Sequence, residues 1–221
     1  STPKPSSAAS DVYKRQHIPF GLITVDGKKL STRSGRIILL AKVLDDSVKL
    51  AAEEINEKNP DLANKDEVAQ QVGVGAIVFG DLKNERTNNI DFVLADQLKF
   101  EGETGPYVQY SHARAESILR KAGKVTITTD GNQISDPEAW DTIKTLADFP
   151  AMVKMACDEF EPSVIAKYAI RLAKTFNKYY AHSKILTEDA ELPARLALVK
   201  AVSTVLKESL RLLGVQAPDE M

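Results

Sequence analysis

A series of apolar residues spaced three and four apart runs from Leu40 almost to the C-terminus, and this feature most restricts the fold. Such spacing places apolar side chains on one stripe of an α-helix. Prolines stand near the expected helix starts and glycines follow the expected ends. The punctuating residues are Pro106, Gly123, Pro137, Pro150, Pro162, Pro193 and Gly214. The pattern predicts a helical bundle, with Asp136 as a helix cap before Pro137.

The segment from residue 18 to residue 40 has a different pattern. Apolar residues alternate up to Val25, a turn follows at Asp26-Gly27, and a β-branched pair stands at Ile37-Ile38. This arrangement predicts two short strands that flank a polar loop. Two strands alone do not make a stable sheet, so they require further partners. Residues 85–102 are polar and acidic, and we expect them to be irregular.

The first sixteen residues do not resemble folded protein. Pro, Ser and Ala dominate up to Ser10, and residues 11–16 look like a translated transposon end of the kind used to fragment DNA libraries. We interpret residues 1–16 as a non-native or disordered scar and leave them out of the fold prediction.

Composition excludes several classes of protein. The chain has 221 residues, 43% of them hydrophobic, which suffices for a real core. No apolar run approaches about 18 residues and the N-terminus has no apolar core, so we expect no membrane span, no signal peptide and a cytoplasmic location. Cys157 is the only cysteine and there are three histidines, so we expect no intramolecular disulfide, no bound metal and no prosthetic group. A monomer is the default expectation.

Charge is distributed unevenly along the chain. The formal net charge is −2, but residues 45–67 carry eight acids against three lysines, a net of −5. Residues 163–216 carry nine bases against four acids, a net of +5. This asymmetry points to a polyanionic partner for the C-terminal part.

The helix expected after Pro162 carries a row of cations on one face. With about 100° per residue, the four cations fall within about 40° of one another, while the apolar stripe lies on the opposite side. No acid occurs between Ser163 and Leu186. We call this row the basic ridge; it comprises Lys167, Arg171, Lys174 and Lys178. It predicts contact with phosphates, and the alternative is an ordinary solvated face.

The helix expected after Pro106 provides a second candidate surface. Tyr107, Tyr110 and Arg114 lie at i, i+3 and i+7, on one stripe. Aromatic rings offer a plane to an unstacked RNA base, and a guanidinium can hold the neighbouring phosphate. The alternative is that the tyrosines pack into the core with their hydroxyl groups at its rim.

The polar loop at residues 27–36 reads GKKLSTRSGR. Its four cations, three hydroxyl groups and two glycines could wrap a triphosphate and neutralise charge on a leaving pyrophosphate. The order of residues is not that of a Walker loop. The alternative is a charged surface loop.

Several of these segments resemble one known family. Residues 29–35, KLSTRSG, look like the KMSKS signature of class I aminoacyl-tRNA synthetases in the loosened form of arginyl-tRNA synthetases, and residues 17–22, HIPFGL, look like the strand before it. Further matches, in the family's order, are VGVGA at 72–76, FEGETGPYVQYSHAR at 100–114, FN at 176–177 and LLGV at 212–215, followed by the ending at Met221. The resemblance covers residues 17–221.

The resemblance implies a fold and a division into domains. The fold would be mainly α: a helical DALR-type anticodon-binding domain at 101–221, preceded at 17–100 by a short β and loop remnant of a class I Rossmann catalytic domain with connecting helices. The implied activity is ligation of arginine to tRNA(Arg) in protein biosynthesis, with ATP as substrate, Mg²⁺ accompanying ATP, and L-arginine as the amino acid.

The resemblance also implies roles for residues. Lys29 and Ser31 would contact ATP phosphates, and because Thr32 replaces the signature's second lysine, Lys28 or Arg33 would supply the missing charge. Residues at family positions that meet anticodon-loop bases are Tyr107, Tyr110, Tyr180 and Met221. Charge assigns Arg114 and the basic ridge to the tRNA backbone.

In the family, the HIGH signature, the arginine pocket and the N-terminal tRNA-elbow domain would lie upstream of His17, so the chain alone should not aminoacylate.

Two other interpretations of the chain stay open at this point. A stand-alone tRNA-binding helical module without catalysis is the first alternative, although such a module has no use for a triphosphate loop. A purely structural helical protein is the second, and it predicts no salt-dependent binding of tRNA.

Overall fold

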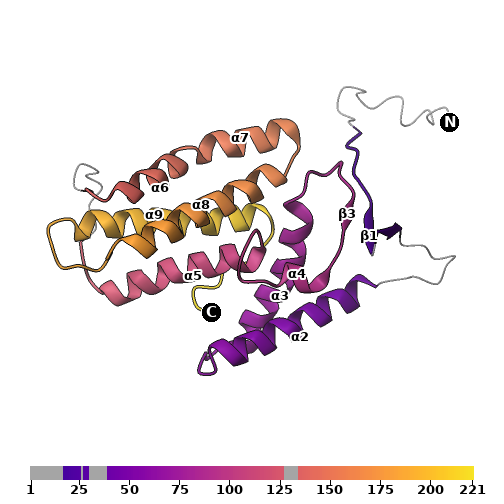
Figure 1. Cartoon of the computed structure of the whole chain (residues 1–221), viewed down its shortest axis with the longest axis horizontal. Helices are drawn as coiled ribbons and strands as arrows, with labels where there is room; N and C mark the ends of the chain where they lie inside the picture. The colour runs from indigo at the N-terminus through magenta and orange to yellow at the C-terminus, as the bar shows by residue number, and fades with distance from the viewer. Residues whose placement is uncertain (1–16, 26, 30–38, 127–133) are drawn as a thin grey trace, which may run out of the picture.

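The structure is a computed structural model that describes residues 17–25, 27–29, 39–126 and 134–221. Helices dominate it, so the prediction of a mainly α fold is confirmed (Figure 1). The elements are β1 (Ile23–Val25), β2 (Lys28–Lys29), α2 (Leu40–Lys58), α3 (Lys65–Leu82), β3 (Ile90–Asp91), α4 (Leu94–Gln97), α5 (Gly105–Ala122), α6 (Pro137–Ala147), α7 (Phe149–Glu159), α8 (Ser163–His182) and α9 (Leu192–Leu212).

The larger part of the molecule is a bundle of α5, α6, α7, α8 and α9 around one hydrophobic core (Figure 1). Helix α8 contributes most, because one of its faces is buried along its whole length, including Leu172 and Phe176. It packs against α6, α7, α9 and α5, and α5 also packs against α9. Helix α7 lies on the outside and buries none of its side chains fully.

Helices α2 and α3 form a second, smaller core, and α3 joins it to the bundle (Figure 1). Glycines make this junction possible. A Cβ atom at Gly73 would lie 2.7 Å from the backbone of Val48 in α2, and one at Gly75 would lie 2.8 Å from the Gln109 side chain in α5. Because the α2 backbone cannot move aside, α3 can approach α2 this closely only with glycine at position 73, whereas a side chain at position 75 would require the Gln109 side chain to shift.

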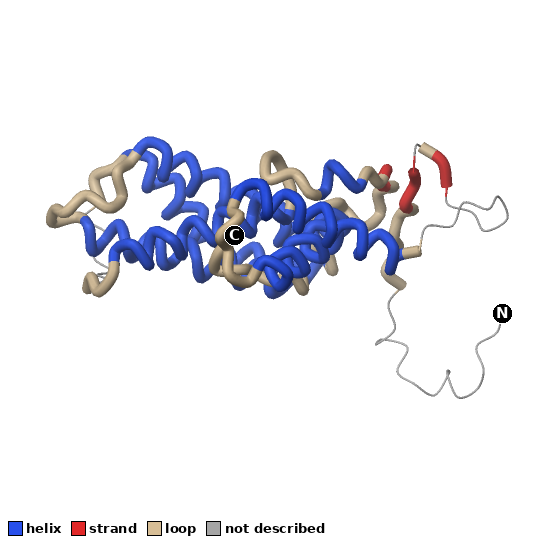
Figure 2. Tube along the Cα trace, turned by 90° about the horizontal axis from the view of Figure 1, so that it is seen from below, coloured by secondary structure: helices blue, strands red, loops and turns tan. Residues whose placement is uncertain are grey.

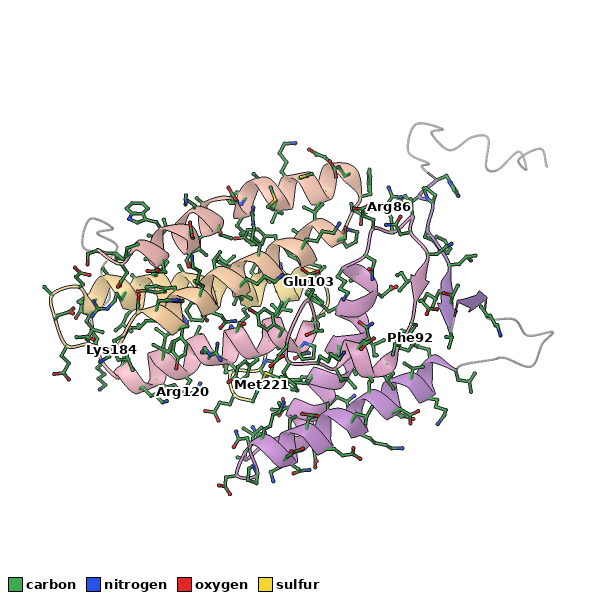
Figure 3. The ribbon with its side chains drawn as sticks, viewed as in Figure 1. Arg86, Phe92, Glu103, Arg120, Lys184 and Met221 are labelled. Atoms are coloured by element: carbon green, nitrogen blue, oxygen red, sulfur yellow. The ribbon has the colours of Figure 1, made fainter. Side chains whose placement is uncertain are left out.

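A small sheet of order β2-β1-β3 lies at one end of the molecule (Figure 2). Strand β1 pairs with β2 in antiparallel fashion and with β3 in parallel fashion. One side chain ties the strands of the sheet together, and another connects the segment before β1 to the bundle. Asp91 Oδ1 accepts hydrogen bonds from the Gly27 amide (2.9 Å) and the Thr24 hydroxyl (2.8 Å). Arg86 donates to the carbonyls of Pro19 (2.9 Å) and Phe160 (3.0 Å), at the junction of strands and bundle labelled in Figure 3.

The helix limits expected from proline and glycine are confirmed, since Pro106, Pro137, Pro150 and Pro193 stand in first turns. The predicted cap at Asp136 is confirmed in its position but not in its hydrogen bonding. Asp136 is the N-cap residue, but its side chain makes no capping hydrogen bond and instead accepts one from the hydroxyl group of buried Tyr179 (3.4 Å).

The prediction for the N-terminal region needs more correction. The expectation that residues 85–102 are irregular holds for most of the segment, but it missed β3 and α4, which lie within it. Lys28 and Lys29, expected in the polar loop, instead form β2. The strand expected at residues 37–38 falls outside the described residues. No described helix is long and apolar enough to cross a membrane.

Candidate nucleic-acid interface

The stripe of α5 predicted to meet RNA is fixed by the way this helix starts. Thr104 is the N-cap residue, and its hydroxyl oxygen accepts a hydrogen bond from the Tyr107 amide (3.2 Å). Pro106 occupies the first turn, where its missing N–H costs nothing. Gly105 lies so close to α3 that a Cβ there would be 2.9 Å from that of Phe79. Cap, proline and glycine together set the rotation of α5.

The structure separates the two predicted tyrosines of this helix. Tyr107 is half-buried and packs against the main core, and its hydroxyl oxygen accepts a hydrogen bond from the Asn177 side chain (3.0 Å). Tyr110 is exposed at 39% of its surface. The alternative of core packing therefore describes Tyr107, whereas Tyr110 is available to a ligand.

Arg114 brings the separated parts of the prediction together. Its guanidinium carbon lies 4.7 Å from the ring centroid of Tyr110 and 4.9 Å from that of Tyr180 in α8. Each contact is a cation–π interaction, and the two tyrosines hold the guanidinium between them. Tyr180 is 44% exposed, so a surface of two aromatic rings and one cation faces outward.

Asn177 holds this arrangement in place, and sequence reasoning gave it no role. Its side-chain amide donates to the Tyr107 hydroxyl and to Ser111 Oγ (2.8 Å), and its carbonyl oxygen accepts a hydrogen bond from Arg114. All three neighbours are on α5, whereas Asn177 is on α8. The only signal in the sequence was its place in the FN pair that resembles the family.

The C-terminal segment, residues 213–221 after α9, borders this surface on the side of α2. The Met221 carbonyl accepts a hydrogen bond from Asn59 Nδ2 (3.0 Å), and the Met221 side chain packs against the smaller core. Figure 3 shows Met221 between the α5 and α2 ribbons. The predicted residues Tyr110, Arg114, Tyr180 and Met221 all line one hollow of about 460 Å³.

Asp219 anchors the segment that carries Met221. Its carboxylate lies 3.1 Å from Nε2 of the fully buried His112 and 3.1 Å from Nζ of Lys207. Burial raises the pKa of Asp219, but the hydrogen bonds from His112 and Lys207 outweigh it and hold this pKa below its usual value. Arg120 also donates to the Asp219 carbonyl (3.0 Å).

The electrostatics of the hollow favour a nucleic acid. Arg114, Arg120 and Lys121 line it, and the one acidic side chain among the lining residues, Glu220, pairs with Arg120 at 3.2 Å, which leaves an excess of two cations. An RNA base requires a ring to lie on, and its phosphate requires a cation, so the hollow offers both kinds of contact.

The basic ridge is where predicted on the exposed face of α8, but it is not a row of uncompensated charge. Each cation has an acid of another element as its partner, at 2.8 to 3.7 Å: Lys167 with Glu85, Arg171 with Asp148, Lys174 with Glu103 and Lys178 with Asp141. The lack of acids within α8 itself therefore does not leave the ridge uncompensated, and its contact with phosphates stays a prediction. Hydrogen bonds from Lys167 and Lys174 hold the pKa values of Glu85 and Glu103 below their usual values.

The predicted ATP loop is described only at its start. Lys28 is exposed in β2, Lys29 pairs in register with Thr24, and Ser31 and Arg33 lie outside the described residues. Asp91 positions the turn before Lys28 through the Gly27 amide, and this hydrogen bond, with a second from Thr24, holds the pKa of Asp91 below its usual value. Sequence reasoning missed Asp91 because its segment was expected to be irregular.

Two family models match the chain. The model described as "DALR anticodon binding domain" matches residues 108–221, and "tRNA synthetases class I (R), catalytic domain" matches residues 6–94. The first match starts inside α5, whereas the predicted domain starts at residue 101. The second starts within the segment interpreted as a scar.

Individual proteins agree with these families. The chain is 70% identical to an arginine–tRNA ligase of Ligilactobacillus salivarius and 71% identical to one of Lactiplantibacillus plantarum, in each case over 93% of this chain and 36% of the relative. The arginyl-tRNA synthetase structure of Thermus thermophilus superposes with a TM-score of 0.86 at 37% identity, over 93% of this chain and 35% of that one. The chain therefore spans about a third of the length of these relatives.

Proposed function

Because the chain belongs to the arginyl-tRNA synthetase family and carries its DALR anticodon-binding domain, we propose that it is the tRNA-binding C-terminal part of an arginine–tRNA ligase. The partner is tRNA(Arg). The observation that carries the proposal is the guanidinium of Arg114 held between Tyr110 and Tyr180, beside Met221 and inside the DALR match.

In this proposal, the anticodon loop lies over the hollow of about 460 Å³ and places a base in it. Unstacked bases lie on the exposed rings of Tyr110 and Tyr180, and the guanidinium of Arg114 and the charges of Arg120 and Lys121 face the phosphates. Tyr107 supports this surface from the interior, through the hydrogen bond that its hydroxyl oxygen accepts from Asn177. The basic ridge is a second, separate contact with the tRNA backbone.

Fluorescence anisotropy with a labelled tRNA(Arg) anticodon stem-loop tests this assignment. The 221-residue chain should bind it, and affinity should fall steeply with salt because phosphate contacts release counterions. Tyr110→Ala should weaken binding by about 1–3 kcal/mol, the range measured for loss of a base-stacking ring. Trp140→Ala is the control, because Trp140 is an exposed aromatic residue that does not line the hollow. Equal losses with an unrelated hairpin would contradict recognition of the anticodon loop.

The second part of the proposal concerns ATP. Lys28, Lys29, Ser31 and Arg33 would contact the triphosphate, with Mg²⁺ held by the phosphates, as this ion is usually bound in such sites. ATP, L-arginine and tRNA(Arg) are the substrates of the whole enzyme. The match to the class I catalytic domain favours this reading over a stand-alone binding module. A cytoplasmic location and a monomeric state stay predictions.

We further propose that the 221-residue chain does not aminoacylate by itself, since it covers 36% of the ligases that it resembles. Arginine-dependent exchange of pyrophosphate into ATP measures the activation step directly. The purified chain should give no signal above a blank without enzyme, and exchange above that blank would contradict the proposal.

A further inference from the structure

A second hollow, of about 740 Å³, lies beside the first and shares Asn59, Tyr110 and Met221 with it. We propose that this second hollow binds one further RNA base, with Phe100 as its stacking ring. The inference rests on the proposed function, because it extends the same RNA-binding surface. Phe100 lies outside both matched segments, 6–94 and 108–221.

The first reason is the continuity of the aromatic surface. The ring of Phe100 meets that of Tyr110 edge to face, with centroids 6.4 Å apart, and Arg114 lies over Tyr110. The rings therefore continue from Tyr180 through Arg114 and Tyr110 to Phe100 without interruption. A single strand that places one base at Tyr110 has Phe100 within reach of the adjacent nucleotide.

The second reason is the chemistry of the lining. Ile55 and Leu98, which are 4% and 7% exposed, line the hollow together with the rings of Phe100 and Tyr110. The charged lining residues balance, two lysines against two glutamates: Lys58, Lys99, Glu54 and Glu101. A hollow with apolar and aromatic side chains in its wall and no net side-chain charge suits the flat face of a base better than a phosphate. The phosphates belong in the first hollow, where cations outnumber acids.

The third reason is that a base can replace the present contact of the Phe100 ring with Lys58. Lys58 Nζ lies 4.6 Å from the Phe100 ring centroid, and this side chain is 58% exposed. An exposed cation–π contact is weaker than the stacking of a base on an aromatic ring. A base can therefore displace the ammonium group of Lys58, whose flexible stem lets it turn toward Glu54, with which it already pairs at 3.0 Å. The volume lies within the range of ligand sites, about 300–1,000 Å³.

The test is a double-mutant cycle between the chain and the RNA. The 221-residue chain and its variants Phe100→Leu and Phe100→Tyr are titrated with tRNA(Arg) anticodon stem-loops in which each loop position in turn is abasic. We expect Phe100→Leu to lose about tenfold in affinity for the intact loop, and Phe100→Tyr to bind like the unmodified chain. At one loop position, the abasic change and Phe100→Leu should cost no more together than either alone.

Several outcomes would overturn the inference. Unchanged affinity of Phe100→Leu would do so, as would a loss that is the same for every abasic loop, since that pattern indicates altered packing of Phe100 against the smaller core. Trp140→Leu is the control for an exposed aromatic residue, because Trp140 lines neither hollow. Thermal melts show whether Phe100→Leu folds. If it does not, Phe100→Trp is titrated with the same set of abasic loops. Affinities of Phe100→Trp equal to those of the unmodified chain for every loop then contradict the proposal.

The same titration separates this inference from the proposed function. If Tyr110→Ala weakens binding while Phe100→Leu does not, the anticodon surface stands and the second base site fails. If the unmodified chain does not bind the stem-loop, the proposed function fails and the inference with it.

Discussion

At the scale of single residues, the candidate interface depends on groups that orient one another. Asn177 is half-buried and makes three side-chain hydrogen bonds to α5. Arg114 alone could adopt many rotamers, because its side chain is long. Hydrogen bonding to Asn177 and stacking between two rings select one of them before any ligand arrives.

Replacing Asn177 should therefore affect both stability and RNA binding. Asn177→Leu keeps a similar volume but loses all three hydrogen bonds, so we expect the free energy of unfolding to fall by about 1–3 kcal/mol. We expect affinity for the anticodon stem-loop to fall about tenfold as Arg114 gains freedom. Urea denaturation and anisotropy measure the two effects.

Asn177→Asp provides the matched control, because its carboxylate keeps the acceptor for Arg114. This variant should retain more RNA affinity than Asn177→Leu. If Asn177→Leu binds RNA like the unmodified chain, Asn177 does not position Arg114.

The basic ridge gives a second test at this scale. Phosphate contact predicts that Arg171→Ala and Lys174→Ala weaken all tRNAs alike and each lower the slope of log affinity against log salt by about 1. Lys200→Ala, an exposed lysine of α9 that pairs with Glu116 at 3.5 Å, is the control. If the slopes do not change, the cations of the ridge form only their intramolecular ion pairs. Exposed pairs of this kind contribute about 0–1 kcal/mol each to stability.

At the scale of elements, α3 is the helix on which the assembly depends, because glycines let it touch α2 and α5 closely. In an open helix, Gly→Ala stabilises by about 1 kcal/mol through helix propensity. At Gly73 the new Cβ would meet the Val48 backbone at 2.7 Å, so steric overlap outweighs propensity. We expect Gly73→Ala to lower the free energy of unfolding by about 1–3 kcal/mol.

Gly80→Ala is the control within the same helix. Its Cβ would meet only the Gln97 side chain, which can move away, whereas the backbone of α2 cannot. Thermal melts of both variants should therefore show the larger fall in Tm for Gly73→Ala. A Gly73→Ala protein that melts at or above the temperature of the unmodified chain would show that α2 is not held against α3 as described.

The elements also show how far sequence carries the fold. Proline and glycine determine the backbone locally, so the starts of α5, α6, α7 and α9 and the ends of α5, α6 and α9 could be predicted, whereas the C-cap residue of α7, Phe160, has a left-handed conformation that no glycine marks. Strand β3 has two residues and depends on pairing with β1. The paired residues Thr24 and Asp91 are 67 positions apart in the chain, so no local pattern shows this strand. The partners of the basic ridge also come from other elements, and a helical wheel cannot include them.

The candidate site divides in the same way. Tyr110, Arg114, Tyr180 and Met221 could be named from the sequence, because their chemical types and the resemblance point to them. That Tyr107 turns inward, and that Asn177 and Asn59 support the surface, depends on which helices pack together. Those contacts are set by the glycines of α3 and the core of α8 rather than by the local sequence.

At the scale of the whole molecule, the interface exists only because the chain closes on itself. The Asn59 side chain in the segment after α2 holds the carbonyl of Met221, 162 residues later. The bundle provides Tyr110, Arg114 and Tyr180, and the smaller core receives Met221. Loss of the C-terminal segment from its place would therefore open both hollows together.

Asp219 gives a pH test of this closure. Its pKa in the folded chain is lowered, so its carboxylate contributes stability that is fully present above the unfolded pKa of about 4 and is lost as pH falls through the folded value. Asp219→Asn should lower the free energy of unfolding by about 1 kcal/mol at pH 7, a modest value because the side chain is 58% exposed. The difference between the two proteins should shrink below about pH 4.

Urea denaturation of both proteins from pH 7 to pH 3 measures this difference, and stem-loop binding at pH 7 measures whether the segment still presents Met221. We expect Asp219→Asn to bind the stem-loop more weakly, because His112 and Lys207 no longer face a negative charge and hold the segment less firmly. Glu208→Gln is the control, since Glu208 pairs with Arg211 within α9 and does not touch the segment. If Glu208→Gln weakens RNA binding as much as Asp219→Asn, general charge and not the closure of the C-terminal segment controls the interface.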